Sequence, residues 1–298
     1  MQTRSTARTP STPDGAQHRS ELPLLLALSV QWDDCSVALG TAEQATSEVW
    51  SAQPERNAEK TVAHAGTFAS RDALLLLDRL LLRTDTVLSA VDQLCFARGP
   101  GAFTSLRVAA GLIQGLALAT SIPVAGICSL AAMAAQDPGW SDAGSKAAPW
   151  LQLSAVDARM GECYFGLHEC RAGHHPVPIT APAVGSPAEA VAIFELTLEQ
   201  RRSHRGQIRI VPAGNGFALL PELSAWAERH GFDPQEAARF SATGEAVLAV
   251  AASIGAPIPG PARTALPVYI RDKIALDVHE QRAGAAARAL AGSSKSSA

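Results

Sequence analysis

Residues 94–120 read LCFARGPGAFTSLRVAAGLIQGLALAT, and this stretch decides the fold. The apolar run Leu94–Ala97 predicts a short buried strand, and Gly99-Pro100-Gly101 then breaks the chain sharply. The long apolar stretch that follows predicts a helix over Thr104–Thr120. A buried strand that turns through glycines into a helix is typical of α/β proteins.

The segment before this motif predicts the rest of a first lobe. Short strands are expected at Leu24–Ser29, Cys35–Gly40 and Thr46–Ala52, joined as a meander. A leucine-rich helix is expected over Ser70–Arg83, with Ser70 as its N-cap. The strands therefore precede the helix, as they do again later in the chain.

The second half repeats this order after a stretch rich in Gly, Ser, Asp and Ala, Asp137–Ala148, which predicts a linker. A hairpin is predicted between Leu151 and His168, a loop over Arg171–Pro187, and one helix over Phe217–His230. Strands followed by helices, twice over, predict two α/β lobes. We expect a disordered tail at residues 1–20, lobes at 21–145 and 146–282, and a second disordered tail at 283–298.

Composition limits the classes of function. The formal net charge of −3 over 298 residues gives no general attraction to polyanions. Five cysteines, an odd number with no CxxC, predict reduced thiols and a cytoplasmic protein. The run Leu22–Val30 resembles a short signal segment, so secretion is the alternative, but Glu21 borders it and a second strand follows at once. No stretch reaches the roughly 18 apolar residues of a membrane span, so we expect no membrane association.

Three places could carry chemistry. Gly99-Pro100-Gly101 and Gly214-Asn215-Gly216 each join a strand to a helix and could cradle an anion. Neither continues into a phosphate-binding motif, so we interpret both as tight turns. Asp157, Arg159 and Glu162 crowd one hairpin turn; they could bind a substrate or partner, or satisfy one another.

The sequence predicts no metal-binding site and no group of catalytic residues. His174-His175 lies without the matching Cys or carboxylate spacing of a metal site. No Ser–His–Asp or Cys–His arrangement is supported either, so we predict no catalytic residue in this chain.

Both predicted helices of the first lobe are apolar on more faces than one sheet can cover. At ~100° per residue, one face of the first helix contains Leu74, Leu76, Leu77, Leu80 and Leu81. The two remaining leucines, Leu75 and Leu82, point away from that face. The second helix has a bulky face (Leu106, Val108, Leu112, Ile113, Leu116) and an opposite face of mostly small residues, in which the glycines are four apart (Ala110, Gly111, Gly115, Ala117, Leu118). Small residues permit close approach of another helix. We therefore predict a partner interface that contains Leu75, Leu82, Arg107, Ala110, Gly111, Gln114, Gly115 and Leu118; the alternative is that the second lobe or the tails cover these faces.

Several of these segments resemble the TsaB (YeaZ-like) family. Residues 99–107 and 111–119 resemble its GPGxFTGxR…GLALA signature, and Asp157–Glu162 looks like its DAR-x-GE hairpin. Cys35–Leu39, Val211–Gly216 and Pro267–Arg271 are similar to further family segments, so the resemblance covers about residues 22–276. The matched motif residues are Gly99, Pro100, Gly101, Phe103, Thr104, Arg107, Asp157, Arg159, Gly161 and Glu162.

The resemblance implies a two-lobed actin-like α/β fold of the hexokinase, Hsp70 and actin superfamily. It implies a pseudo-enzyme that pairs with a TsaD-like catalytic paralogue, through the first two helices of the first lobe. With a TsaE-like ATPase, such complexes transfer a threonylcarbamoyl group to the adenosine beside the tRNA anticodon. The chain itself would hold no cofactor; ATP and a metal ion would bind to the partner subunits, and tRNA would bind through the complex. A homodimer is the alternative when the chain is alone.

Two departures from the family pattern bear on activity. Ser29 and Val30 stand where the family's opening strand usually ends in Asp-Thr, and Ser105 stands where the signature has Gly. Loss of that carboxylate argues against nucleotide turnover. The histidine pair that holds metal in the paralogue has no counterpart, since His64 stands alone before the first helix. The rival functions are a small-molecule kinase or ATPase of the same superfamily and a secreted glycoprotein peptidase.

Overall fold

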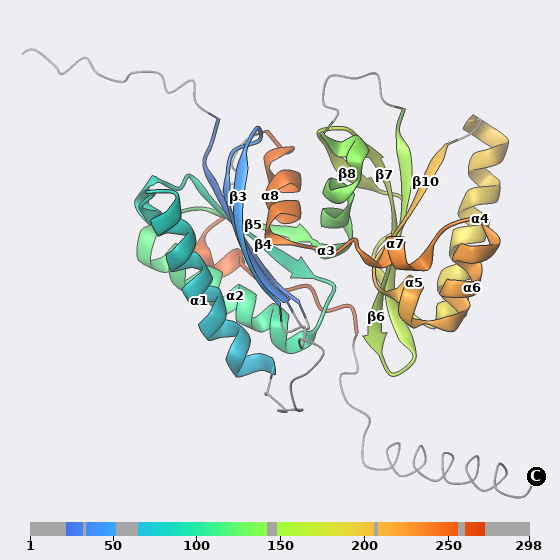
Figure 1. Cartoon of the computed structure of the whole chain (residues 1–298), viewed down its shortest axis with the longest axis horizontal. Helices are drawn as coiled ribbons and strands as arrows, with labels where there is room; N and C mark the ends of the chain where they lie inside the picture. The colour runs from blue at the N-terminus through green and yellow to red at the C-terminus, as the bar shows by residue number, and fades with distance from the viewer. Residues whose placement is uncertain are drawn as a thin grey trace, which may run out of the picture.

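The computed structural model describes residues 22–31, 34–51, 65–141, 148–205, 208–255 and 260–271. Within them the chain forms two sheets of five strands each, with helices on the outer faces and between the sheets (Figure 1). The predicted tails and His64 lie outside the described residues.

The first sheet has the order β3-β2-β1-β4-β5. β1, β2 and β3 pair antiparallel, which confirms the predicted meander, and β4 and β5 add parallel strands beside β1. A meander can use short turns, whereas each parallel strand needs a crossover helix. The strands are β1 (Leu25–Val30), β2 (Asp34–Gly40), β3 (Ala45–Ser51), β4 (Gln93–Gly99) and β5 (Val124–Cys128).

The second sheet repeats the pattern in the order β10-β6-β7-β8, with β9 also paired to β7. β6, β7 and β8 form an antiparallel meander, and β10 lies parallel to β6 as β4 lies to β1. Two lobes of related topology confirm the predicted actin-like architecture. The strands are β6 (Trp150–Arg159), β7 (Glu162–Arg171), β8 (His174–Pro178), β9 (Ala183–Gly185) and β10 (Arg209–Ala213). The prediction of a loop over Arg171–Pro187 is wrong, because β8 and β9 pair with β7 there.

Two long helices cover the outer face of the first sheet: α1 (Ala65–Arg83) and α2 (Phe103–Thr120). α1 begins at least five residues before the predicted start, so Ser70 lies inside the helix and is not its N-cap. Ala65 and Ala69 favour a helix, which offsets the lower helix propensity of Gly66, and no proline interrupts the segment. Buried leucines of α1 pack with Ile113 of α2 on β1 and β2, and form a core that is separate from the inner face.

Helix α8 (Gly244–Ala252) lies between the two sheets (Figure 1). Although the sequence places it in the second half, α8 packs on β1, β2 and β4 of the first sheet, which differs from the expected division at residue 145. The Gly244 N–H donates to Ser36 Oγ (2.8 Å), and a Cβ at Gly244 would come within 3.1 Å of β2 backbone atoms. This close approach buries Ala246, Val247 and Val250 against the sheet.

The second sheet carries its own helices on the outer face, around stacked and tilted rings of Phe194, Phe217 and Trp226. A single helix over Phe217–His230 was predicted, but the structure divides it at Leu220, because Pro221 has no N–H to continue the ladder. The helices are α4 (Pro187–Arg205), α5 (Gly216–Leu219), α6 (Pro221–Arg229) and α7 (Pro234–Ala238).

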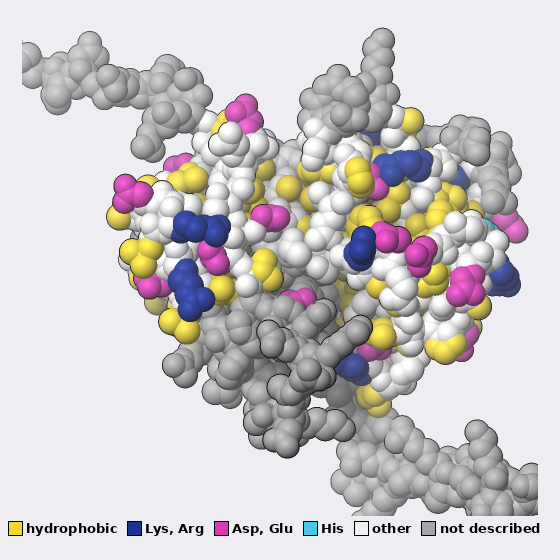
Figure 2. Space-filling model, viewed as in Figure 1, with side chains coloured by type: hydrophobic (Ala, Val, Ile, Leu, Met, Phe, Trp, Pro, Cys, Tyr) yellow, Lys and Arg dark blue, Asp and Glu magenta, His cyan; other side chains and the backbone are white. Residues whose placement is uncertain are grey.

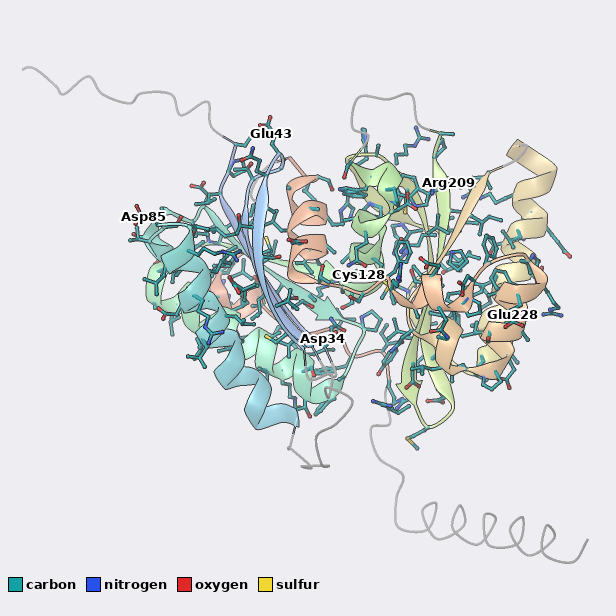
Figure 3. All side chains as sticks on the ribbon, viewed as in Figure 1. Asp34, Glu43, Asp85, Cys128, Arg209 and Glu228 are labelled. Carbon is teal, nitrogen blue, oxygen red and sulfur yellow. The ribbon has the colours of Figure 1, made fainter. Side chains whose placement is uncertain are left out.

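The segment expected to be a linker is partly structured. Asp137 is 3 % exposed, and Trp140 is buried as well. A two-bond ion pair with Arg209 of β10 (2.8 and 2.6 Å) compensates the charge of the buried Asp137 carboxylate. Arg209 lies toward one end of the second sheet in Figure 3. The pair ties the end of the first lobe to the second sheet. The remaining short helices are η1 (Leu88–Ala90), α3 (Ser129–Ala132), η2 (Met133–Gln136), η3 (Pro138–Trp140) and η4 (Ala262–Thr264).

Candidate functional site

An apolar surface lies on the solvent side of α1 and α2, and we call it the helix face. Its large side chains are exposed: Leu118 by 80 %, Leu82 by 74 % and Leu75 by 45 %. Gly111 and Gly115 lie between them on α2, and a Cβ at either glycine would meet nothing within 4 Å. Figure 2 shows hydrophobic side chains on this side of the first lobe, interspersed with charged ones. The helix face consists of Leu74, Leu75, Leu82, Gly111, Gly115 and Leu118.

Four positions differ from the predicted facing. Ala110 and Ala117, expected on the small-residue face, are buried against the sheet, because the inward stripe of α2 runs through Leu106, Ala110, Ile113 and Ala117. Leu74, expected inside, is half exposed. Leu112 is only partly buried, because it lines a shallow apolar groove between α1 and α2.

Arg107 and Gln114 connect α2 to the C-terminal segment. Gln114 Nε2 donates to the carbonyl of Ala265 (2.9 Å), and Arg107 Nε donates to Tyr269 Oη (3.1 Å). The Arg107 guanidinium lies 3.9 Å from the Phe103 ring centroid, and that ring packs on Tyr269 at 5.0 Å. These two predicted interface residues therefore bind the C-terminal segment of the same chain, so their polar groups are already engaged there.

The hairpin between β6 and β7 is held in one conformation. Arg159, Met160 and Gly161 all have positive φ (65°, 59° and 79°), which a tight turn requires. The Asp157 carboxylate accepts from the Arg159 N–H (2.9 Å) and forms an ion pair with its guanidinium (3.5 Å). Asn215 Oδ1 in turn accepts from the Asp157 N–H (3.0 Å). Asp157 and Arg159 thus pair within the turn, as one of the two sequence interpretations holds, whereas Glu162 pairs with Arg271 outside it. The turn presents Met160 and Arg159 to solvent.

The C-terminal segment Val268–Arg271, which we call the strap, bridges the two lobes. The Val268 N–H donates to the carbonyl of Arg98 in the first lobe (2.7 Å). At its other end, Arg271 Nη2 forms an ion pair with Glu162 of the second lobe. The sequence alone gave no reason to place residues 268–271 beside residues 98–107; the only signal was the matching family motif.

The strap closes one side of a cleft between the lobes, which we call the strap cleft. Its volume is about 210 Å³. The other walls come from the corner at residues 100–103 and from the β6–β7 hairpin, so the three family motifs meet here. The lining residues are Pro100, Gly101, Phe103, Ala158, Arg159, Met160, Tyr164 and Val268–Arg271.

Gly99 has the geometry of a tight corner. Its φ is +115°, and a Cβ there would lie 2.8 Å from the Val268 carbonyl oxygen. Only glycine fits both constraints. Gly214 meets the same two conditions, with φ +114° and the Ala155 carbonyl 2.2 Å from a Cβ. The two glycine motifs accordingly serve close packing of strand against strap and strand against helix.

The end of β1 is filled by hydrogen-bonded side chains. Ser29 is fully buried, and Gln31 Nε2 donates to its Oγ (2.9 Å). Ser105 Oγ donates to the Gln31 carbonyl (2.9 Å) and so joins the first turn of α2 to the β1–β2 connection. Asp34, the acidic residue that begins β2, lies at the end of the first sheet (Figure 3). The two serines that depart from the family pattern are therefore part of one contact.

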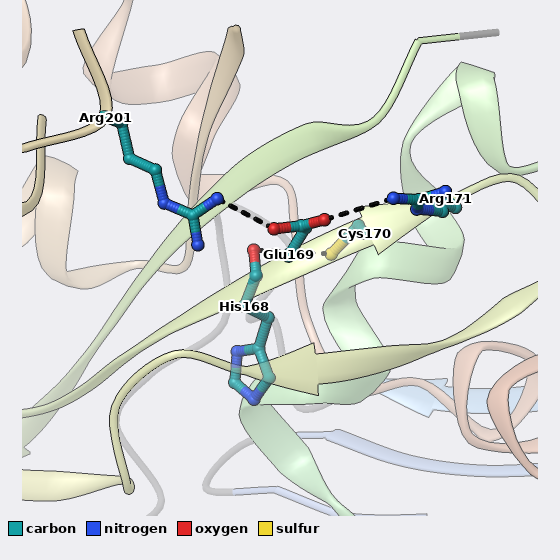
Figure 4. Close-up of polar contacts among 5 residues, drawn as sticks. All are labelled: His168, Glu169, Cys170, Arg171 and Arg201. Atoms are coloured by element: carbon teal, nitrogen blue, oxygen red, sulfur yellow. Dashed lines mark hydrogen bonds and ion pairs between the residues drawn. The ribbon is translucent and has the colours of Figure 1, made fainter. Parts of the chain in front are cut away.

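Burial shifts the pKa of several thiol and imidazole groups among the described residues. Among these residues there is no group of three or more His, Cys, Asp or Glu side chains that could hold a metal ion. Burial raises the pKa of Cys95, Cys163 and Cys170 to about 12, so these thiols stay protonated. Burial lowers the pKa of His168 to about 4. Beside it, Glu169 pairs with Arg171 and Arg201 (Figure 4).

Within the described part of the chain, α2 has the length and apolar composition of a membrane-spanning helix. One such helix is weak support for a membrane span, because core helices of soluble proteins pass the same test. Here it packs along one side on β1 and β4.

Comparison with known proteins agrees with the motifs. Residues 66–219 match the family model described as "TsaD: tRNA N6-adenosine threonylcarbamoyltransferase". Two curated relatives are named "tRNA threonylcarbamoyladenosine biosynthesis protein TsaB". The one from Haemophilus influenzae is 37 % identical over 145 residues, which cover 47 % of this chain and 52 % of the relative. The one from Escherichia coli K12 is 31 % identical over 153 residues, which cover 50 % and 58 %. The chain thus spans a little over half the length of the curated relatives it matches.

Solved structures extend the similarity to both lobes. YeaZ from Pseudomonas aeruginosa is 27 % identical with a TM-score of 0.57, covering 83 % of this chain and all of that one. A second Pseudomonas aeruginosa structure, described as an uncharacterized protein with similarity to peptidase YEAZ, is 28 % identical with a TM-score of 0.58, covering 84 % of this chain and all of that one. The family model covers more than half of the chain, and the named relatives place it among the TsaB proteins. The chain belongs to the family that this model describes, on its TsaB (YeaZ) branch.

Proposed function

We propose that the chain is a non-catalytic subunit in the biosynthesis of threonylcarbamoyladenosine in tRNA. It pairs through the helix face with a TsaD-type catalytic paralogue, and a TsaE-type ATPase and tRNA join the complex. The observation that carries the proposal is the helix face itself, where Leu82 and Leu118 are at least 74 % exposed beside two open glycines. Large apolar side chains gathered in this way mark a protein interaction site.

The dimensions of this surface favour a helical partner. Gly111 and Gly115 are one turn apart, so a partner helix could approach the α2 backbone between the flanking leucines. A stable interface buries ~800 Å² per partner, which two helices of 18 and 19 residues can supply. Because a second copy of the chain carries the same surface, a homodimer is the alternative occupant.

The end of β1 supports a non-catalytic role. Actin-like enzymes need an acidic residue in the first turn, and Ser29 takes that position here, closed off by Gln31. The rival function is a small-molecule kinase or ATPase, for which Asp34, the first residue of β2, is a candidate acidic residue among those that the structure describes. Its carboxylate has a buried Oδ1 without a hydrogen-bond partner among the described residues.

The proposed location is the cytoplasm, where the tRNA substrate is. Of the five cysteines, four are buried and none forms a disulfide, as expected of thiols that are kept reduced. The proposed cofactors, ATP and a metal ion, would bind to the partner subunits.

Co-expression with the TsaD-type paralogue of the same organism tests the proposal. We expect a stoichiometric complex on size-exclusion chromatography and no ATP hydrolysis or tRNA modification by the isolated chain. The kinase alternative would be favoured if the isolated chain turned over ATP and if one substitution, Asp34→Asn, abolished the turnover.

A further inference from the structure

The strap cleft is lined by charged and aromatic side chains that have no part in the proposed docking at the helix face. Among its described lining residues the only charged side chains are Arg159 and Arg271. Three aromatic rings, those of Phe103, Tyr164 and Tyr269, also contribute to the walls. Guanidinium groups bind phosphate and carboxylate through paired N–H donors, and aromatic walls stack on flat rings.

Arg271 can take a further acceptor, and Arg159 is largely exposed to solvent. Arg271 Nε is buried and has no hydrogen-bond partner among the described residues, although the other end of the guanidinium pairs with Glu162. A buried N–H without an acceptor costs free energy that a ligand oxygen would recover. Arg159 is 55 % exposed and lies 3.5 Å from the Asp157 carboxylate, a solvent-screened pair that an incoming anion could replace.

The start of α2 adds to the positive potential. Its N-cap is Ala102, which gives no side-chain cap to the first turn, and both Gly101 and Phe103 line the cleft. The first-turn amides of an 18-residue helix carry a partial positive charge, so an anion is favoured beside them. The helix end, the two guanidinium groups and the rings thus converge on one space.

The size of the cleft restricts the ligand. At about 210 Å³ it is smaller than the roughly 300–1,000 Å³ typical of sites for drug-sized molecules. It would accept one phosphate with an adjoining ring, and a triphosphate chain would extend outside. Almost half of the Tyr269 side chain remains exposed, which leaves ring surface for stacking.

We propose that the strap cleft binds a single phosphorylated nucleoside, with the phosphate between Arg159 and Arg271 and the base against the aromatic wall. The same chemistry is offered by a free mononucleotide and by an unstacked nucleotide of an RNA chain. The site is separate from the helix face, so its failure would leave the proposed pairing function unaffected.

Calorimetric titration of the full chain tests the proposal, with AMP, adenosine, inorganic phosphate and a single-stranded RNA heptamer as probes. We expect AMP to bind at least about tenfold more tightly than adenosine or phosphate alone, because only AMP offers both groups. If the heptamer binds and AMP does not, the ligand is a nucleotide within RNA.

Arg159→Ala and Arg171→Ala form a matched pair of variants. Arg171 is 59 % exposed and 3.4 Å from Glu169, much as Arg159 is placed beside Asp157, but Arg171 is the last residue of β7 and does not line the cleft. We expect Arg159→Ala to weaken binding of AMP or of the heptamer at least about tenfold and Arg171→Ala to leave it unchanged, with both variants melting like the parent chain. Binding of none of the probes, or equal effects of the two substitutions, would overturn the proposal.

Discussion

Placing a charge on the helix face separates docking from folding. Leu118 is 80 % exposed in the isolated chain, so Leu118→Asp removes little buried surface there. We expect the free energy of unfolding to change by less than about 1 kcal/mol, mostly through the lower helix propensity of Asp. Gly115→Glu should be tolerated in the same way, because a Cβ at that position meets nothing within 4 Å.

The effect on docking should be much larger. A leucine that becomes fully buried contributes roughly 1.5–3 kcal/mol, and an unpaired carboxylate in its place must in addition be desolvated. The expected loss is therefore at least about 3 kcal/mol, or more than about 100-fold in dissociation constant. Size-exclusion chromatography with the TsaD-type paralogue, with thermal melts of each variant alone, measures both quantities.

Two controls make the result interpretable. Leu196→Asp introduces the same charge on α4 at a leucine that is 55 % exposed on the other lobe, and pairing should persist. Ile113→Asp places the charge in the core beneath α2, where the side chain is fully buried, and should unfold the chain. Leu112→Asp is a poorer control, because Leu112 is only partly buried. Normal pairing of both Leu118→Asp and Gly115→Glu would refute the assignment of this surface.

Three further outcomes concern stability and can be followed by urea denaturation. His168 has a folded pKa of about 4 against an ordinary value of 6.5, so stability present above pH 6.5 should fall by about 3 kcal/mol as pH drops to 4, and His168→Gln should remove most of this dependence. Arg209→Ala leaves the buried Asp137 carboxylate without its ion pair and should cost about 2 kcal/mol. Gly99→Ala forces a Cβ toward the strap carbonyl at φ +115°, and should cost about 1–3 kcal/mol and release the strap to proteolysis.

Local patterns predicted the fold well where strand or helix periodicity was strong. The meander, the long helix after Gly101 and the hairpin around residue 160 were all predicted from short-range signals. The errors arose where a neighbour in space decides the structure. β8 has no clear alternation of its own and becomes a strand because β7 offers an edge to pair with. Asp137 lies in a segment whose composition is typical of a linker. Its carboxylate can nevertheless be buried, because the guanidinium of Arg209, 72 residues later, forms an ion pair with it.

The candidate site was predictable in part. Helical periodicity indicated that Leu75, Leu82 and Leu118 would face away from the core, and these side chains are exposed. The inward side of α2 was predicted only in part: Leu106 and Ile113 are buried as expected, but Ala110 and Ala117 are buried too. These alanines let the helix lie close to the sheet, and an average hydrophobicity pattern cannot distinguish them from a small-residue outer face. The strap cleft depends on contacts between residues more than 100 positions apart, such as Glu162 and Arg271, and no spacing rule reports them.

The position of α8 has a consequence for folding during translation. The inner face of the first sheet is covered by residues 244–252, which leave the ribosome only after the whole second lobe has been made. Until then Leu25, Ala27 and Ala38 of β1 and β2 have no helix over them on that side. In the nascent first lobe the inner face of the sheet is thus incompletely covered, and other apolar peptides could bind there. A fragment ending at residue 145 should need a peptide of residues 240–255, supplied in trans, to remain soluble.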